Sequence, residues 1–333
     1  MPKKVNILPF PVVYYLPETR WAFGAAVTST FRFKRDSTNA RPSQLSLGAV
    51  RTQEKQTLLY LPFQLFYDNA NYYANGEVGF FRYNFYYFGV GEREVPQELY
   101  GVDFPRIKVN LFKKIAPKLY AGLRYQYEDY KITTTVPNGE FANLRVPGTP
   151  RSRTSGTGLG LFYDSRDVIF FPSKGAILDV AYFHNAPVWG GDVRFDRISA
   201  DASFYQKLSK RAVLATNLWG SVAWGNVPFN MMAELGGPKK MRGYYQGRFR
   251  DNNVLLAQTE LRFDIFKRFG GVIFGSTGMM GNESRLLRTD DWKYSYGAGL
   301  RFTANRRDHL NIRIDYALGQ NSRNFYLTIG EAF

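Results

Sequence analysis

The residue types that most often carry chemistry are scarce in this sequence. Cysteine is absent, and histidine occurs only as His184 and His309. Without cysteine the chain can form no disulfide, thiolate metal site or cysteine nucleophile. Neither histidine stands at a spacing from a serine and an acid that indicates a hydrolase, and no G-x-S-x-G, H-E-x-x-H or P-loop motif occurs. The sequence therefore predicts a protein that is not an enzyme and that needs no cofactor or metal.

The most distinctive polar segment surrounds an arginine that lies among glycines. Its residues of interest are Gly236, Gly237, Met241, Arg242, Gly243 and Tyr244. A guanidinium is a planar donor that stays charged and pairs well with carboxylates, and glycine lets the backbone turn sharply and approach a wall closely. Taken alone, the segment is typical either of an exposed Arg-Gly-Tyr turn or of a loop held by an inward-facing acid such as Glu260.

The elements that must position this loop are strands with alternating faces. Between residues 293 and 303, Tyr294 and Tyr296 share one face and Arg301 lies on the other. The same period of two recurs at 119–127, 255–265 and 310–318. Soluble sheets alternate as well. Here, however, the polar face carries arginines and acids, the apolar face ends in aromatic residues, and the strands reach about ten residues, as a tilted strand in a membrane requires.

Counting these segments predicts an all-β fold, a transmembrane antiparallel up-and-down β-barrel of sixteen strands. The predicted strands span residues 11–17, 20–35, 43–53, 56–67, 72–82, 105–114, 117–130, 154–163, 174–185, 193–208, 211–224, 252–266, 269–280, 293–303, 310–318 and 325–333. An even strand number, short turns and longer polar loops are typical of bacterial single-chain barrels, and closure leaves no strand edge in lipid. We expect residues 1–10 to be a short periplasmic segment and 11–333 to be one barrel domain.

The charge balance narrows the choice of partners. The formal net charge is +16, and the basic residues are spread along the whole chain. Because nucleic-acid binders usually gather their charge in a patch or stripe, nucleic acid is not an expected partner. A basic lumen, and contact with outer-membrane lipid and phosphate-rich lipopolysaccharide, fit the balance better. Prolines interrupt the N-terminal apolar stretch, so we expect an outer-membrane protein whose signal peptide has been removed from this sequence.

An aromatic run stands out at residues 83–88, which read Tyr-Asn-Phe-Tyr-Tyr-Phe. Aromatic side chains gather at membrane interfaces, where one end is apolar and the other is wet. The run therefore favours an interface girdle, or a loop packed over the barrel mouth, over a platform for a ligand.

Three segments resemble the BamA/TamA-type superfamily of outer-membrane assembly and translocation barrels, the bacterial surface antigen family. Residues 236–244 are similar to the G-G-x-x-x-V-R-G-Y/F loop signature, with Met241 where valine is usual. Residues 258–262 resemble the strand after that loop, with Glu260 at its inward acidic position. Residues 163–175 resemble the D-x-R-D…P-x-x-G turn of the family. The resemblance covers essentially the whole chain, and the arginine-loop motif is fairly specific.

The resemblance implies that loop 225–251 folds into the lumen and that Arg242 pairs with the inner wall. Glu260 is one expected partner. The other stands at Ser276, where the family's F-x-D-x-G carries an aspartate. Because Arg242 would lose one expected partner, this replacement predicts that the loop is held less tightly and is more mobile. The family also carries periplasmic polypeptide-transport-associated domains before its barrel, so the sequence resembles a form that lacks them.

The first and last strands have to pair to close the barrel. The expected seam residues are Val12, Tyr14, Phe325, Leu327 and Phe333. The first strand is predicted to be short, and the prolines that flank it donate no ladder hydrogen bonds. A weak seam is what lateral opening toward lipid requires, and a frayed terminus would have the same sequence. In this family the closing Phe333 also fits the aromatic C-terminus that the barrel assembly machinery reads during biogenesis.

Two functions are consistent with these features. In the first, a plugged pore with a lateral seam translocates or inserts polypeptide or lipid, with a separate periplasmic partner or a homo-oligomer in place of the missing domains. In the second, the chain is a passive porin-like or structural barrel that keeps the family scaffold. A soluble, lipid-binding β-protein is a third reading, which extraction without detergent would support.

Overall fold

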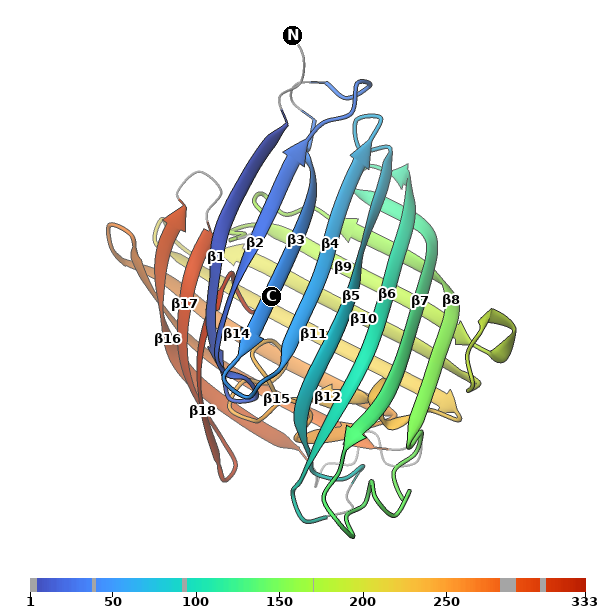
Figure 1. Cartoon of the computed structure of the whole chain (residues 1–333). Helices are drawn as coiled ribbons and strands as arrows, with labels where there is room; N and C mark the ends of the chain where they lie inside the picture. The colour runs from blue at the N-terminus through green and yellow to red at the C-terminus, as the bar shows by residue number, and fades with distance from the viewer. Residues whose placement is uncertain (1–4, 38–39, 92–94, 170, 282–291, 306–309) are drawn as a thin grey trace.

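Sixteen antiparallel strands close into one barrel in the computed structural model (Figure 1). The structure describes residues 5–37, 40–91, 95–169, 171–281, 292–305 and 310–333. Consecutive barrel strands pair with one another, and β1 meets β18 to complete the ring. The predicted fold class and strand number are confirmed. Among the described residues, no helix is long and apolar enough to cross a membrane.

The strands of the barrel occupy most of the chain. They are β1 (Asn6–Leu16), β2 (Arg20–Phe31), β3 (Ser43–Thr52), β4 (Thr57–Tyr67), β5 (Tyr72–Tyr87), β6 (Glu98–Ala116), β7 (Leu119–Thr134), β8 (Arg151–Asp164), β9 (Gly175–Asn185), β10 (Phe195–Lys207), β11 (Ala212–Gly225), β14 (Asn253–Phe266), β15 (Phe269–Gly281), β16 (Lys293–Asn305), β17 (Leu310–Gly319) and β18 (Ser322–Ile329). The loop between β9 and β10 holds a 3₁₀ turn, η1 (Pro187–Trp189). The loop between β11 and β14 holds η2 (Phe229–Met231) and a two-stranded sheet of β12 (Ala233–Leu235) and β13 (Phe249–Asp251).

Several boundaries differ from the prediction. β1 begins at Asn6 rather than at residue 11, so residues 6–10 belong to the barrel. β5 continues to Tyr87 and β6 starts at Glu98, because the two strands stay paired through this aromatic stretch. There the alternation of polar and apolar residues disappears, since aromatic side chains occupy both faces. At the C-terminus, β18 ends at Ile329 instead of reaching residue 333.

The two faces of the strands have the chemistry that the alternation predicted. Tyr296 is 63% exposed on the outer surface, whereas Arg313 is 2% exposed on the inner face. The same contrast separates the outward Ile265 from the inward Glu260 on β14. Apolar and aromatic side chains therefore face the position of the lipid, and the arginines and acids are enclosed by the barrel.

Part of the lumen is filled by aromatic rings instead of charges. Phe81, Tyr87, Tyr100, Phe104 and Tyr130 form one buried cluster with Phe141 and Phe229 from two loops. Tyr83 and Phe85 of the aromatic run pack against this cluster, while Tyr86 and Phe88 contact Tyr245. The run is therefore split between the lumen and a contact with the loop, and it does not form a simple interface girdle.

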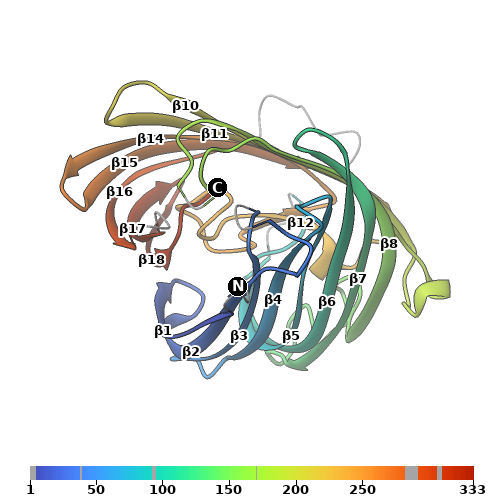
Figure 2. The ribbon, with the colours of Figure 1, turned by 90° about the horizontal axis from the view of Figure 1, so that it is seen from above.

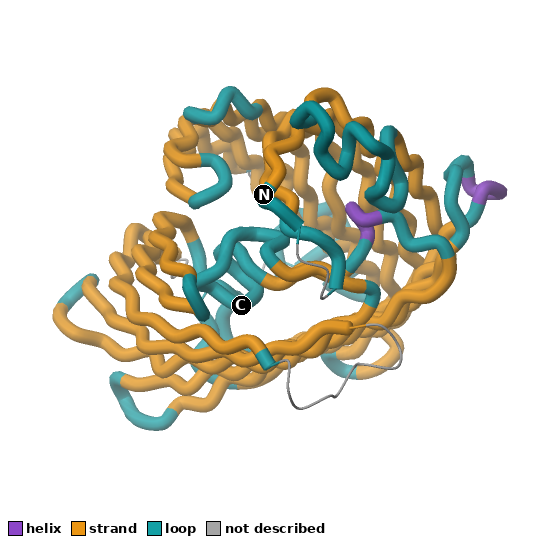
Figure 3. The backbone as a smooth tube through the Cα atoms, turned by 90° about the horizontal axis from the view of Figure 1, so that it is seen from below, coloured by secondary structure: helices purple, strands orange, loops and turns teal. Residues whose placement is uncertain are grey.

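The long connection between β11 and β14 lies inside the ring of strands. Figures 2 and 3 show this segment, with its small β12–β13 sheet, within the barrel outline. Leu235, Met241 and Tyr244 of the connection are buried in a cluster with Val254 and Leu256 of β14. The barrel wall thus supplies the contacts that position the predicted arginine segment.

Candidate functional site

The site is built around Arg242, whose side chain is 1% exposed. Its Nη1 donates to Oδ2 of Asp315 on β17 at 2.6 Å, and its Nη2 donates to Oε1 of Glu260 on β14. The guanidinium carbon lies 3.5 Å from the ring centroid of Phe274 on β15. Three barrel strands therefore hold one loop side chain by two charge-assisted hydrogen bonds and a cation–π contact.

One of the two expected partners needs correction. The structure places Glu260 against Arg242, but Ser276 is not a partner of this arginine. Ser276 stands opposite Ser295 in the strand register, and the two hydroxyl groups hydrogen-bond at 2.7 Å. Asp315 supplies the second carboxylate instead.

The sequence did show Asp315 on the polar face of its strand, but not its distance from Arg242. Strand β17 is separated from β14 by β15 and β16 in the barrel. The closed curvature of the wall brings the two carboxylates to one guanidinium. Phe274 was missed for the same reason.

Arg242 belongs to a buried network of four arginines and three carboxylates. Glu260 also accepts from Arg262 at 2.7 Å, and Asp315 accepts from Arg301 at 2.6 Å. Arg313 lies 3.5 Å from Asp315, and Arg301 donates to Glu331 at 2.8 Å. Glu260 and Asp315 each pair with more than one arginine, and Glu331 pairs with Arg301. These pairings offset the cost of removing the charges from water. Such a network fixes geometry more than it adds net stability.

The backbone around Arg242 is held by the last strand of the barrel. The amide N of Gly243 donates to the hydroxyl of Tyr326 at 3.1 Å, and Asn324 donates to the carbonyl of Gly243 at 2.8 Å. Gly243 has φ +110°, and a Cβ there would lie 2.9 Å from the carbonyl carbon of Leu318. Only glycine fits both this backbone conformation and this approach to β17.

The other motif residues shape the same turn. Tyr244 donates its hydroxyl to the carbonyl of Tyr294 at 2.7 Å, and Met241 is fully buried with φ +67°. Gly236 has φ +113°, and its amide donates to the carbonyl of Lys240 at 2.7 Å. Gly237, with φ +85°, donates to the carbonyl of Tyr244 at 2.9 Å. The six residues therefore form one compact hairpin against the wall.

The seam between β1 and β18 is joined by little backbone pairing. In the described residues, one register pair links the two strands, Tyr15 with Leu327. By contrast, β1 is paired with β2 over its whole length, from Asn6 to Leu16. The ring of Tyr15 also lies 5.6 Å from that of Phe325. Because Pro9 and Pro11 lack an N–H, part of β1 has no donor to offer a neighbour.

The other expected seam residues differ in where they lie. Val12 and Tyr14 are on β1, one of the two seam strands, and their side chains pack against the aromatic cluster of the lumen. Phe333 is away from β18: its carbonyl oxygen accepts from Arg262 at 3.0 Å, and its ring lies 5.4 Å from the same guanidinium. The chain turns away after β18 because Gly330 has φ +84° and Arg301 holds Glu331.

Glu18, in the turn between β1 and β2, contacts the arginine loop from the other side of the seam. Its Oε1 accepts from the amide N of Gln246 at 2.7 Å, and the residue is 3% exposed. Burial raises the pKa of Glu18 to about 7, and nearby Glu234 adds to this, while the hydrogen bond from Gln246 opposes it. The loop is thus attached to β18 by Asn324 and Tyr326 and to the β1–β2 turn by Glu18.

We expect the attachment through Glu18 to weaken as pH rises. The folded protein keeps this proton up to about pH 7, whereas the unfolded chain releases it near 4.5. Protonated Glu18 therefore contributes its full stabilisation below about pH 4.5. As the pH rises to about 7, the free energy of unfolding falls by up to about 3 kcal/mol. Hydrogen exchange of residues 241–250, corrected for intrinsic rates, should show less protection at about pH 8 than at about pH 5.

A matched pair of variants checks this result. Glu18→Gln should remove the pH dependence, and Glu54→Gln, at a half-exposed glutamate, should retain it. If both variants keep the wild-type pH profile, Glu18 does not control the loop.

Outside this loop, the described histidine and the acids of the 163–175 turn make local contacts. His184 Nδ1 lies 2.8 Å from Asp196 Oδ1 at an accessible position, and His309 lies outside the described residues. Asp164 pairs with Arg166 at 2.9 Å, and Asp167 accepts from the amide N of Ser173, so these acids stabilise their own turn. Within the described ranges, no group of three or more histidines and acids is placed to hold a metal ion.

The closed barrel of sixteen strands, with its buried arginine loop, places this protein among the membrane-spanning β-barrels. A family model described as the Omp85 superfamily domain matches residues 81–333. The chain belongs to the Omp85 superfamily, and it is accordingly a bacterial outer-membrane protein. None of the curated proteins matches the sequence.

Solved structures share this fold at low sequence identity. BamA from Haemophilus ducreyi lacking POTRA domains 1–3 is 16% identical with a TM-score of 0.65, over 98% of this chain and 70% of that one. CdiB from Acinetobacter baumannii is 14% identical with a TM-score of 0.63, over 99% of this chain and 65% of that one. CdiB from Escherichia coli is 12% identical with a TM-score of 0.67, over 99% and 67%. At these identities the likeness establishes the fold.

Proposed function

We propose that this chain translocates polypeptide, or inserts polypeptide or lipid, at the outer membrane through movements of the arginine loop and the β1–β18 seam. The observation that supports this most is that one loop is attached to both sides of a seam with a single paired residue. The Omp85 superfamily consists of transporters and assembly factors that do not catalyse chemical reactions. Activity would then come from changes in conformation.

The energetics of the seam favour opening there over any other strand pair. Strands β10 and β11 share thirteen register pairs and β17 and β18 share eight, against one between β1 and β18. Unpaired backbone groups in hydrocarbon cost several kcal/mol each, so separating a long ladder in lipid is prohibitive. Parting β1 from β18 exposes few additional groups.

The partners that fit this proposal are those of an outer-membrane machine. They are outer-membrane lipid and lipopolysaccharide around the barrel, the barrel assembly machinery during biogenesis, and a separate periplasmic partner or a second copy of the chain. A cross-linking pulldown from intact cells would identify the periplasmic partner.

A disulfide across the seam tests the proposal. Tyr15→Cys with Leu327→Cys places two thiols at directly opposite positions in a chain that has no other cysteine. We expect oxidation to abolish the ability of the protein to accelerate insertion of an unfolded outer-membrane protein into vesicles. Reduction should restore it, because the lock removes the opening and leaves the barrel intact.

Thr216→Cys with Thr259→Cys is the matched control, at opposite positions of the paired strands β11 and β14. Oxidising this pair should leave activity unchanged. Full activity of the oxidised seam pair would rule out gating at the seam. A wide, constant conductance with no insertion activity in the wild type would instead support the passive porin or structural barrel.

A further inference from the structure

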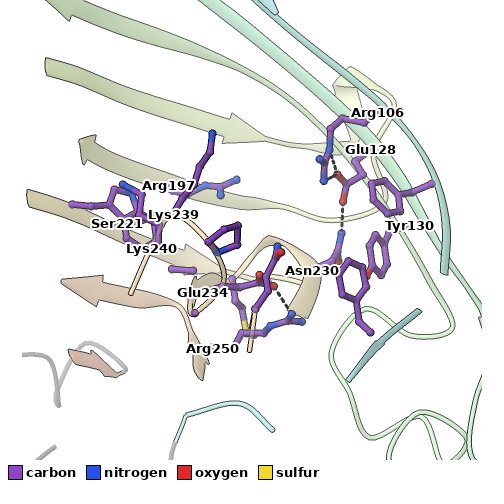
Figure 4. Close-up of a pocket in the computed structure, with 18 of the residues that line it drawn as sticks. Arg106, Glu128, Tyr130, Arg197, Ser221, Asn230, Glu234, Lys239, Lys240 and Arg250 are labelled. Carbon is purple, nitrogen blue, oxygen red and sulfur yellow. Dashed lines mark hydrogen bonds and ion pairs between the residues drawn. The ribbon is translucent and has the colours of Figure 1, made fainter. Parts of the chain in front are cut away.

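A cavity of about 410 Å³ lies in the lumen between the arginine loop and strands β6, β7, β10 and β11 (Figure 4). Its size falls within the range of pockets that bind small organic molecules. The residues that the mechanism above uses, Arg242, Glu260 and Asp315, do not line it. The cavity therefore lies apart from the contacts of Arg242, although the arginine loop supplies part of its lining.

The ionisable groups that line this cavity are mostly basic. The five basic residues are Arg106, Arg197, Lys239, Lys240 and Arg250, and the two acidic ones are Glu128 and Glu234. Both acids are already occupied, Glu128 by Arg106 at 2.7 Å and Glu234 by Arg250. Lys240 is paired with Asp201 at 2.6 Å. Two cations are left over in the lining.

These two cations are Arg197 on β10 and Lys239 on the loop. Among the described residues neither has a carboxylate partner. The hydrogen bonds of Arg197 are long, to the carbonyl oxygen of Met231 at 3.4 Å and to its sulfur at 3.9 Å. In Figure 4 both side chains are separate from the two carboxylates of the lining, and no interaction joins them to the residues drawn. Arg197 is partly buried and also lies over the ring of Phe195 at 5.8 Å, and Lys239 is exposed to the lumen. A cation without a carboxylate partner gains from an anionic ligand.

Aromatic side chains line another part of the same cavity. Phe85, Tyr100, Phe104 and Tyr130 contribute aromatic surface to the lining. Phe104 stacks on Tyr130 with ring centroids 5.1 Å apart, and the hydroxyl groups of Tyr100 and Tyr130 hydrogen-bond at 3.3 Å. Tyr100, Phe104 and Tyr130 are almost fully buried, so this wall is preformed by packing and gives the cavity a rigid apolar lining.

We infer that this cavity binds a small amphipathic anion, a phosphate or carboxylate group carried on an aromatic or short apolar body. Arg197 and Lys239 attract the charge, and the aromatic wall takes the body. The site lies in the lumen and is lined in part by the arginine loop, and its occupation is measured by ligand binding and not by insertion activity.

Isothermal titration calorimetry of the detergent-solubilised barrel tests the site with three probes. Phenyl phosphate has both features, inorganic phosphate lacks the ring, and phenol lacks the charge. We expect phenyl phosphate to bind about tenfold more tightly than inorganic phosphate, and phenol not to bind measurably. Arg197→Gln should weaken phenyl phosphate by about tenfold or more, and Lys239→Gln should weaken it severalfold.

Lys131→Gln is the matched control, because it makes the same charge change at an exposed position of β7 that does not line the cavity. It should leave binding unchanged. Lys239 lies on the loop surface, where a substitution disturbs the fold least. The Lys239→Gln variant therefore still tests the site if circular dichroism shows that Arg197→Gln does not fold. The inference is overturned if phenyl phosphate does not bind, if inorganic phosphate binds equally well, or if the control weakens binding as much as the two site variants.

Discussion

Replacing Asp315 by alanine should lower the free energy of unfolding of the barrel by about 3 to 5 kcal/mol. Asp315 is fully buried, and it is the carboxylate that Arg242, Arg301 and Arg313 share. Its removal leaves three enclosed guanidinium groups with less counter-charge, which costs more than the pair interaction itself contributed. Urea unfolding of the protein in vesicles, followed by tryptophan fluorescence, measures the change.

Ser276→Ala is the matched control for this experiment. Ser276 stands at the family's aspartate position, but its hydroxyl bonds to Ser295 and not to Arg242. We expect a change within about 1 kcal/mol, the value of one neutral hydrogen bond. The assignment of Asp315 as the second anchor would be wrong if Ser276→Ala destabilised the barrel as much as Asp315→Ala.

The second large effect is expected for Gly243→Ala, which should release the loop from the wall. The added Cβ would lie 2.9 Å from the carbonyl carbon and oxygen of Leu318, at a residue with φ +110°. Backbone strain costs about 1 to 3 kcal/mol, and overpacking adds about as much. The hairpin would have to move away from β17, and Arg242 would then lose its partners.

Trypsin reports this release directly, because Arg242 is buried in the barrel and inaccessible to the protease. We expect cleavage after Arg242 to be fast in Gly243→Ala and slow in the wild type. Gly190→Ala is the control: Gly190 has φ +92°, but no heavy atom lies within 4 Å of an added Cβ. Equal cleavage in both variants would show that general destabilisation of the barrel, and not the contact of residue 243 with β17, explains the result.

Gly243→Ala acts on contacts that also reach the seam. The loop is joined to Tyr326 and Asn324 of β18 through Gly243, and to Glu18 of the β1–β2 turn through Gln246. Releasing the loop therefore removes hydrogen bonds from both flanks of the least-paired strand junction in the barrel. We expect Gly243→Ala to increase hydrogen exchange in β18 as well as in the loop.

The sequence alone was enough to predict the barrel and the number of its strands. Alternation at period two survives in almost every strand, because each residue must face either lipid or an enclosed polar lumen, and the two media select opposite side chains. The prediction failed where this contrast vanishes: between Tyr83 and Tyr87 the lumen itself is aromatic, and both faces of the strand look alike.

Only the tertiary structure decided which side chains meet. Arg242, Glu260 and Phe274 were visible as residues, but the partnership with Asp315 depends on how far the wall curves between β14 and β17. The seam likewise depends on register, which left Tyr15 opposite Leu327 and carried Phe333 into the lumen. Alternation determines the face on which a side chain lies and is a local property. Curvature and register are set by the closure of all sixteen strands together, so no local pattern contains them.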